Sequence, residues 1–253
     1  ADKILSVNKF NIKWEKMYGA DPEKIEIIYN GIDHNVFKPT PKPEHLKDIP
    51  TVVAAARIFD LKDIVTMIKS CEVAKRQIPN IQYLVYGDNN AVPEYTAECE
   101  RLIDELDLKE NFKLAGYHDK PSELFCEGDI SILTSISEGF PYTVLESMSC
   151  GIPVVATDVG GVTEALDNSC GYICKPKDAE DIGNRVVELL NNKELREQMG
   201  INARKKVIEN FTIGKFVNAY EEVYERVVTR EVKEVQMPIL IQSLDEIQSV
   251  KAS

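Results

Sequence analysis

The feature that most constrains the fold of this chain is a regular alternation of short β-branched runs with longer helical patterns. Several of the runs are apolar at every position, which is typical of strands that are covered on both faces. Strand and helix in alternation predict an α/β protein with a doubly wound parallel sheet of Rossmann-like type. The six predicted strands are 51–56, 81–86, 111–115, 130–134, 153–157 and 171–174.

Helical patterns fill the intervals between these runs. Right-handed crossovers through such helices bring the carboxyl ends of all parallel strands to one edge of the sheet, where ligands bind in folds of this type. We therefore expect the functional residues in loops that directly follow strands. The predicted helices are 63–78, 94–106, 120–126, 143–150, 179–191, 193–210 and 213–228.

Proline content indicates where the main domain begins. Segment 37–50 contains four prolines, so it can be neither a central strand nor a helix interior. This composition favours an extended linker, with an ordinary surface loop as the alternative. The chain then divides into residues 1–36, which belong to another domain, the linker 37–50, a main domain over 51–212, and a C-terminal helix and tail over 213–253. The sequence leaves the conformation of the tail open.

The net charge limits the classes of partner. The chain of 253 residues has 30 basic and 42 acidic side chains, which gives a net charge of −12. Such an acidic surface disfavours nucleic acid or an anionic membrane as the main partner, so an anionic ligand requires a local cluster of cations or backbone amides. No run of 18 apolar residues occurs, and we expect no membrane span.

Metal chemistry has little support in the sequence. The six cysteines form no CxxC pair and the three histidines lie far apart, so we expect no metal site and the scattered thiols of a cytoplasmic protein. The chain opens with Ala1, without a signal peptide, inside a segment that is patterned like folded protein. We interpret it as a piece of a longer protein.

The densest group of candidate functional residues is segment 137–151, SEGFPYTVLESMSCG. Glu138 follows a predicted buried strand and should therefore lie at the ligand edge. Gly139 and Pro141 predict a tight turn, after which a helix starts near Thr143. The first amides of a helix have no partner within it, and together with the helix dipole they form a ready site for an anion.

Glu146 is expected in the first turn of this helix, where a carboxylate can accept two hydrogen bonds from a ribose diol. The residues themselves leave another interpretation open. Thr143 and Glu146 also have the spacing of a capping box, in which the glutamate would accept a hydrogen bond from the threonine amide. Glu138, taken alone, could equally be a solvated loop carboxylate.

Glu138 and Glu146, with seven residues between them, resemble the paired glutamates of retaining glycosyltransferase family 4. The stretch EGFPYTVLESMSCGIPVVATDVGGVTE is similar to that family's pattern almost throughout. The resemblance implies the C-terminal half of a GT-B fold, with the first glutamate on the donor sugar and the second on the ribose. It also implies that the residues between them bind the donor, namely Gly139, Phe140, Pro141, Tyr142 and Thr143.

A second match is independent of the first. In VVAAARIFDLKDI, Arg57 and Lys62 are spaced like the family's arginine and lysine, which neutralise the donor diphosphate. A site without a metal needs two such cations. Without the resemblance, pairing of these cations with Asp60 and Asp63 on the surface would be the ordinary interpretation.

Further matches extend the resemblance over roughly residues 1–228. YNGIDHNVF, residues 29–37, is similar to the segment where the family's chain crosses between its domains. Gly116 and Tyr117, with His118, lie where the base of the nucleotide is held in the family. Of the N-terminal acceptor domain, residues 1–36 would retain only the last helix and strand, so the acceptor domain is a missing partner.

One departure narrows the assignment. The family has glycine after its lysine, whereas Lys62 is followed here by Asp63. This variant, with EYTAECERLIDEL downstream, is similar to the PelF-type branch, cytosolic transferases of Pel exopolysaccharide synthesis that favour UDP-glucose. Proteins of exopolysaccharide assembly would then be partners.

The resulting prediction is the donor-binding part of a hexosyltransferase that uses a UDP-sugar as substrate, with no cofactor and no metal. Glu138, Arg57 and Lys62 are its candidate catalytic residues, and the piece alone should be inactive. One rival, an NAD-dependent dehydrogenase, requires a G-x-G-x-x-G motif after its first strand, which VVAAARIFD lacks. The other rival, a non-catalytic module that binds a nucleotide or a partner protein, stays open.

Overall fold

The computed structural model describes residues 1–229 of the chain. Its main body is a parallel six-stranded sheet in the order β5-β4-β3-β6-β7-β8. The chain runs outward from β3 to β5 and then returns to the other side of β3 for β6, so the strand order reverses between β3 and β6. The predicted doubly wound α/β fold is confirmed. The strands are β3 (Thr51–Ala55), β4 (Gln82–Tyr86), β5 (Phe112–Gly116), β6 (Ile130–Leu133), β7 (Val154–Thr157) and β8 (Gly171–Cys174).

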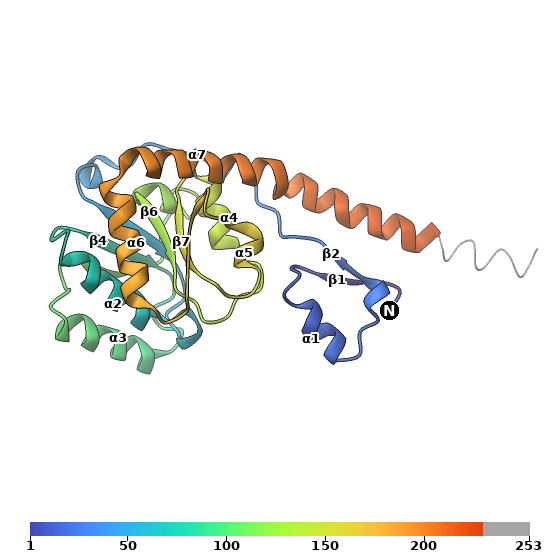
Figure 1. Ribbon diagram of the computed structural model, residues 1–253, viewed down its shortest axis with the longest axis horizontal. Helices are drawn as coiled ribbons and strands as arrows, with labels where there is room; N and C mark the ends of the chain where they lie inside the picture. Colours follow the sequence, from blue (N-terminus) through green and yellow to red (C-terminus); the bar gives the residue numbers. More distant parts are fainter. Residues whose placement is uncertain (230–253) are drawn as a thin grey trace, which may run out of the picture.

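Helices cover both faces of this sheet because alternate strand residues point to opposite sides. On one side, Val52 and Ile132 pack against α2, α3 and α6, and on the other, Leu133 and Ala156 pack against α4, α5 and α7 (Figure 1). The helices are α2 (Ile64–Lys75), α3 (Pro93–Glu105), α4 (Tyr142–Ser149), α5 (Val162–Ala165), α6 (Ala179–Asn191) and α7 (Lys193–Asn210).

One predicted helix is wrong. Segment 120–126 is not an α-helix, and only a 3₁₀ turn forms there, over Leu124–Glu127. Leu124, Phe125 and Cys126 are consecutive and all buried against the sheet. The expected helix is only seven residues long and lies just before Gly128, and in so short a connection a 3₁₀ turn replaces the helix.

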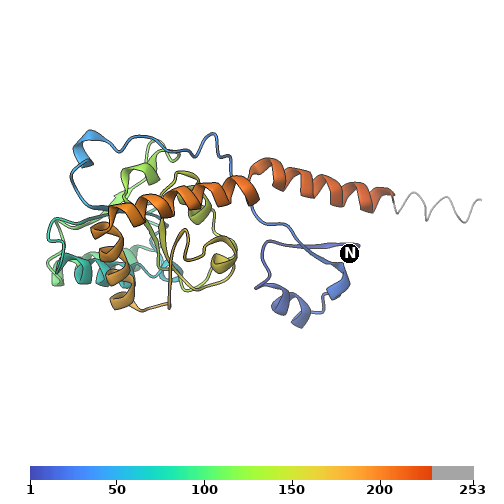
Figure 2. The same ribbon diagram turned by 45° about the horizontal axis from the view of Figure 1, so that its top comes forward.

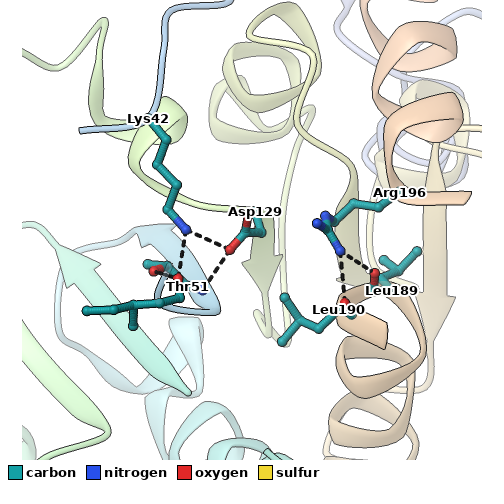
Figure 3. A network of polar contacts seen from close by, with 7 residues as sticks. Lys42, Thr51, Asp129, Leu189, Leu190 and Arg196 are labelled. Carbon is teal, nitrogen blue, oxygen red and sulfur yellow. Dashed lines mark hydrogen bonds and ion pairs between the residues drawn. The ribbon is translucent and has the colours of Figure 1, made fainter. Parts of the chain in front are cut away.

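Segment 37–50 is extended and packs against the sheet of the main body. It contains a short 3₁₀ turn, Glu44–Leu46, which buries Leu46 against the sheet. Lys42 Nζ lies 2.7 Å from Asp129 Oδ2, which also accepts a hydrogen bond from the Thr51 amide at 2.9 Å (Figure 3). This network joins the segment to the amino ends of β3 and β6.

The same view shows how α6 ends. Arg196, from the first turn of α7, donates to the carbonyl oxygens of Leu189 and Leu190 at 2.9 and 3.0 Å (Figure 3). The last carbonyls of a helix have no partner within it, so this guanidinium satisfies two of them and fixes α7 against α6.

Residues before the main body form a small unit of their own. Strands β1 (Ile4–Ser6) and β2 (Ile25–Ile27) pair in parallel as a two-stranded sheet, with α1 (Ile12–Met17) between them (Figure 1). The sequence predicted only a helix and a strand here, so β1 is an addition. Because it is three residues long, it carries too little periodicity to be recognised.

The chain crosses between this unit and the main body twice, at one place. The Ile32 amide donates to the Phe211 carbonyl at 2.8 Å, and the Ile213 amide donates to the Ile32 carbonyl at 2.9 Å. Beyond this crossing, residues 213–229 form the predicted helix, which extends away from the sheet in both views (Figures 1 and 2). Arg226 on that helix pairs with Glu26 of β2 at 2.6 Å. The predicted tail, from residue 230 onward, lies outside the described residues.

Candidate donor site at the switch point

The loops that follow β3 and β6 lie side by side where the strand order reverses. The Ile136 amide donates to the Leu61 carbonyl at 2.9 Å. Thr134 Oγ1 lies 2.9 Å from the carbonyl oxygen of Lys62 and 3.0 Å from that of Asp63. In doubly wound sheets this reversal is the place where ligands bind, and the two loops are fixed to each other before any ligand arrives.

Lys62 and Glu138 meet at this place. Lys62 Nζ lies 2.5 Å from Glu138 Oε1, and the two side chains are only 20% and 11% exposed. The Ser135 hydroxyl donates to the same carboxylate oxygen at 2.6 Å. The structure thus brings together two candidate residues that are 76 positions apart in the sequence.

The nearby aspartates do not pair with Lys62. Asp60 accepts a hydrogen bond from the Leu61 amide, while Asp63 caps α2 by accepting from the amide and hydroxyl of Thr66. Asp63 has a left-handed backbone, with φ of 48°. The position therefore has the conformation that glycine adopts most readily, and the capping bonds offset part of the strain of an aspartate there.

Arg57 is placed differently from Lys62. It lies on the surface just after β3, and its guanidinium carbon is 5.1 Å from the ring centroid of Phe59. Within residues 1–229 no carboxylate lies within ion-pair distance of it. Its long side chain is thus held over an aromatic ring with its charge exposed.

The helix after Glu138 begins without a side-chain cap. Helix α4 starts at Tyr142, one residue earlier than predicted, and Pro141 occupies its N-cap. The predicted place of Glu146 in the first turn is wrong, since it is the fifth residue of α4. No capping box forms in the described chain, where the Thr143 hydroxyl is buried without a hydrogen-bond partner. Burial raises the pKa of the Glu146 carboxyl to about 7.

The turn between Glu138 and α4 is packed from below by aromatic rings. Phe140 is buried, and its ring centroid lies 5.0 Å from that of Tyr29 and 5.4 Å from that of Phe211. Asn30 Nδ2 donates to the Phe140 carbonyl at 2.8 Å. Tyr142, the first residue of α4, is half exposed. The turn is thus held by residues that precede the main domain in the sequence.

The residues predicted to hold the base lie at the carboxyl end of β5. Gly116 has φ of +72°, and Tyr117 after it is 78% exposed. His118 is better fixed, because its Nε2 lies 3.0 Å from Glu127 Oε1 while its Nδ1 accepts from the Lys120 amide at 2.9 Å. Tyr117 therefore offers an open ring surface beside a rigid histidine.

The sequence analysis did not identify several residues that shape this site. Ser135 and Thr134 fix Glu138 and Lys62, as described above. Their signal was present, since they lie three and four residues before Glu138, where a predicted strand ends. Tyr29 and Asn30 belong to the segment that resembles the family's domain crossing, but their contacts with the turn gave no signal, because Asn30 bonds to a backbone carbonyl and the Tyr29 ring packs on a residue far along the chain.

Two further observations concern the described part of the chain. Between residues 1 and 229, no group of three or more His, Cys, Asp or Glu side chains is arranged to hold a metal ion. In the same range, no helix is both long enough and apolar enough to cross a membrane.

The order of strands, with the site between β3 and β6, is that of the C-terminal domain of two-domain GT-B glycosyltransferases. Solved structures agree with this class. The C-terminal domain of a group 1 glycosyltransferase from Francisella tularensis superposes over its whole length and 72% of this chain, with a TM-score of 0.64 and 24% identity. Anabaena HepE in complex with UDP-glucose has a TM-score of 0.81 and 21% identity, and the match covers 90% of this chain and 64% of HepE.

The chain belongs to the family of group 1 glycosyl transferases, whose model matches residues 37–206. The family resemblance noted in the sequence is therefore confirmed. N-acetyl-alpha-D-glucosaminyl L-malate synthase of Bacillus anthracis is 28% identical over 213 residues, which cover 79% of this chain and 53% of that enzyme. An Escherichia coli alpha-1,3-galactosyltransferase that uses UDP-Gal is 24% identical over 81% of this chain and 55% of its own length. The chain thus spans about half the length of these curated relatives.

Proposed function

We propose that this chain binds a UDP-sugar, with UDP-glucose as the first candidate, and forms the donor half of a retaining hexosyltransferase. The observation that carries the proposal is the meeting of Lys62 with Glu138 beside the uncapped start of α4. A cation and helix amides can bind a diphosphate, and a carboxylate can accept hydrogen bonds from the hydroxyls of the attached sugar.

The residues would divide the donor between them. Lys62, Arg57 and the first amides of α4 would hold the diphosphate, and Glu146 would accept hydrogen bonds from the ribose. The half-buried Lys62 needs an anion, and Glu138 supplies it in the free protein. Once the diphosphate takes over this role, Glu138 can accept hydrogen bonds from the hydroxyls of the sugar.

The chemistry would depend on charge stabilisation. As the bond between the sugar and UDP breaks, negative charge grows on the leaving diphosphate, where Lys62, Arg57 and the α4 amides would stabilise it. Preorganised donors of this kind act without reorganising at the moment of reaction. Glu138 acts in this scheme by orienting the sugar, and we assign it no nucleophilic role.

We further propose that residues 51–212 are the donor domain, 37–50 its linker and 1–36 a part of the acceptor domain, with residues 213–253 as the returning helix and tail. On this basis the chain binds the donor but does not transfer sugar without the rest of the acceptor domain. The Lys62–Asp63 variant supports a place in the PelF-type branch, and hence a role in exopolysaccharide synthesis with assembly proteins as partners. A panel of UDP-hexoses would test the preference for glucose.

Calorimetric titration of the chain with UDP, ADP, GDP and NAD tests the proposal. We expect UDP to bind most tightly, with an affinity that survives EDTA and weakens as salt increases, because part of it comes from charge pairing. Lys62→Ala should lower the affinity by about one decade, since a charge-assisted hydrogen bond contributes about 1.5–3 kcal/mol. Tightest binding of NAD would favour a dehydrogenase. Binding of none of the four nucleotides would favour a module that recognises a protein.

A further inference from the structure

The side chain of Glu164 joins the N-terminal unit to the donor site. It lies in α5, three residues after Gly161, and its carboxylate accepts hydrogen bonds from the Lys9 amide at 2.8 and 3.0 Å and the Phe10 amide at 3.2 Å. The Tyr29 hydroxyl donates to the same carboxylate at 2.9 Å. One side chain of the main body thus holds three groups of the segment that precedes it.

One of the groups held by Glu164, the Tyr29 side chain, is itself in contact with the turn between Glu138 and α4, here called the donor turn. The Tyr29 ring packs on Phe140, and the next residue, Asn30, donates to the Phe140 carbonyl. Burial, followed by the hydrogen bond to Glu164, raises the pKa of the Tyr29 hydroxyl to about 12, so the phenol stays a donor to the carboxylate at neutral pH.

A second layer of contact runs through the glycine pair before α5. The Gly161 amide donates to the Gly139 carbonyl at 2.7 Å. A Cβ added to Gly161 would lie 2.7 Å from Asn8 Cβ and 2.9 Å from the Gly139 carbonyl oxygen. The backbone at Gly161 therefore lies close to both the N-terminal segment and the donor turn, with no room for a side chain between them.

We propose that Glu164 is a positioning residue that couples docking of segment 7–11 to the shape of the turn Gly139–Phe140, and so to recognition of the donor sugar. The inference rests on the proposed function and extends it. Docking of the acceptor-side segment holds Tyr29 and Asn30 under Phe140. The turn next to Glu138 then keeps the conformation in which its backbone can meet a sugar.

This role predicts that Glu164→Gln affects the binding of UDP-glucose but not the binding of UDP. The diphosphate and ribose would be held by Arg57, Lys62 and Glu146, which Glu164 does not touch, so UDP affinity should stay within about twofold in Glu164→Gln. The additional affinity of UDP-glucose over UDP should fall by about fivefold to tenfold, as expected for the loss of about one ordinary hydrogen bond.

Matched variants of the full chain make the test specific. Glu94→Gln removes the same charge from the first turn of another helix, α3, and should change neither ligand's affinity. Glu164→Asp keeps a carboxylate and should restore part of the sugar-dependent affinity. Tyr29→Phe keeps the ring on Phe140 but loses the hydroxyl, and should have a smaller effect than Glu164→Gln.

Hydrogen exchange provides the structural readout. The amides of Lys9 and Phe10 should exchange about tenfold faster in Glu164→Gln than in the wild type, and unchanged in Glu94→Gln. Faster exchange with an unchanged advantage of UDP-glucose over UDP would overturn the coupling and leave Glu164 a structural contact. If the wild type itself binds UDP-glucose no more tightly than UDP, the proposed function fails as well.

Discussion

Lys62 and Glu138 form an ion pair across the point where the sheet reverses its strand order, with 2.5 Å between Nζ and Oε1 and little exposure of either side chain. Within the protein itself, each of the two charges is satisfied by the other. A donor that brings a diphosphate and sugar hydroxyls can replace each partner, so neither charge is left buried and uncompensated during the exchange.

This pairing leads to a prediction for Glu138. We expect Glu138→Ala to leave UDP affinity nearly unchanged, while the additional affinity of UDP-glucose over UDP disappears. Calorimetric titration with both ligands measures the difference. An equal loss for UDP and UDP-glucose would instead show that Glu138 acts on the nucleotide part.

Glu146 gives a prediction with a defined pH range. Because burial raises its pKa from 4.5 to about 7 in the folded protein, the folded state binds the proton more tightly than the unfolded state. Ionisation of the buried Glu146 carboxyl therefore lowers the stability of the fold. This cost is absent below about pH 4.5, grows between pH 4.5 and 7, and is complete above about pH 7. Glu146→Gln should therefore stabilise the protein at pH 8 by roughly 2 to 3 kcal/mol and have no such effect at pH 4.

The same variant tests the ribose contact. Loss of the carboxylate should weaken UDP binding by about one to two decades, since hydrogen bonds to a charged acceptor contribute about 1.5–3 kcal/mol each. Denaturant melts and UDP titrations of one preparation give both numbers. A stabilised variant with normal UDP affinity would remove Glu146 from the site, whereas loss of stability at pH 8 would contradict the predicted cost of its buried charge.

Gly160 should tolerate no side chain. Its φ is +56°, and an added Cβ would lie 1.9 Å from the Glu138 carbonyl oxygen. We expect Gly160→Ala to cost about 1–3 kcal/mol of stability and to weaken UDP-glucose more than UDP. Gly19→Ala is the control, because Gly19 also has positive φ, +89°, but nothing lies within 4 Å of its Cβ position. Equal losses in the two variants would show that backbone strain alone, and not contact with the donor turn, is responsible.

The Asp129 network should matter for stability and not for binding. Asp129→Ala would leave Lys42 without its carboxylate partner and the Thr51 amide without its acceptor, at a cost of about 2 kcal/mol. The melting temperature should fall by about 4–8 °C. UDP affinity should stay unchanged because the network lies at the amino ends of the strands, and a tenfold loss would contradict this. Lys47→Ala, which removes an exposed cation nearby, should have little effect on either.

The sequence predicted the sheet well because each strand has its own apolar run and each helix fills one interval. It also predicted that Lys62 and Glu138 would share an edge, since parallel strands end together. Their pairing was not predictable, because it depends on how Thr134 and Ser135 fix two loops. The contact of Glu164 with residues 9 and 10 was further out of reach, because the donating groups are backbone amides, which are the same in every sequence.

The crossing at Ile32 and Thr212 has a consequence for protein engineering. The polypeptide enters and leaves the main body at adjacent points, so residues 33–211 form a loop that closes on itself. A domain whose two ends lie close together can be inserted into another protein or exchanged, because the receiving protein needs only one site of attachment. The main body could therefore be exchanged as a unit for that of a group 1 relative. Both new junctions would then lie where Ile32 pairs with Thr212.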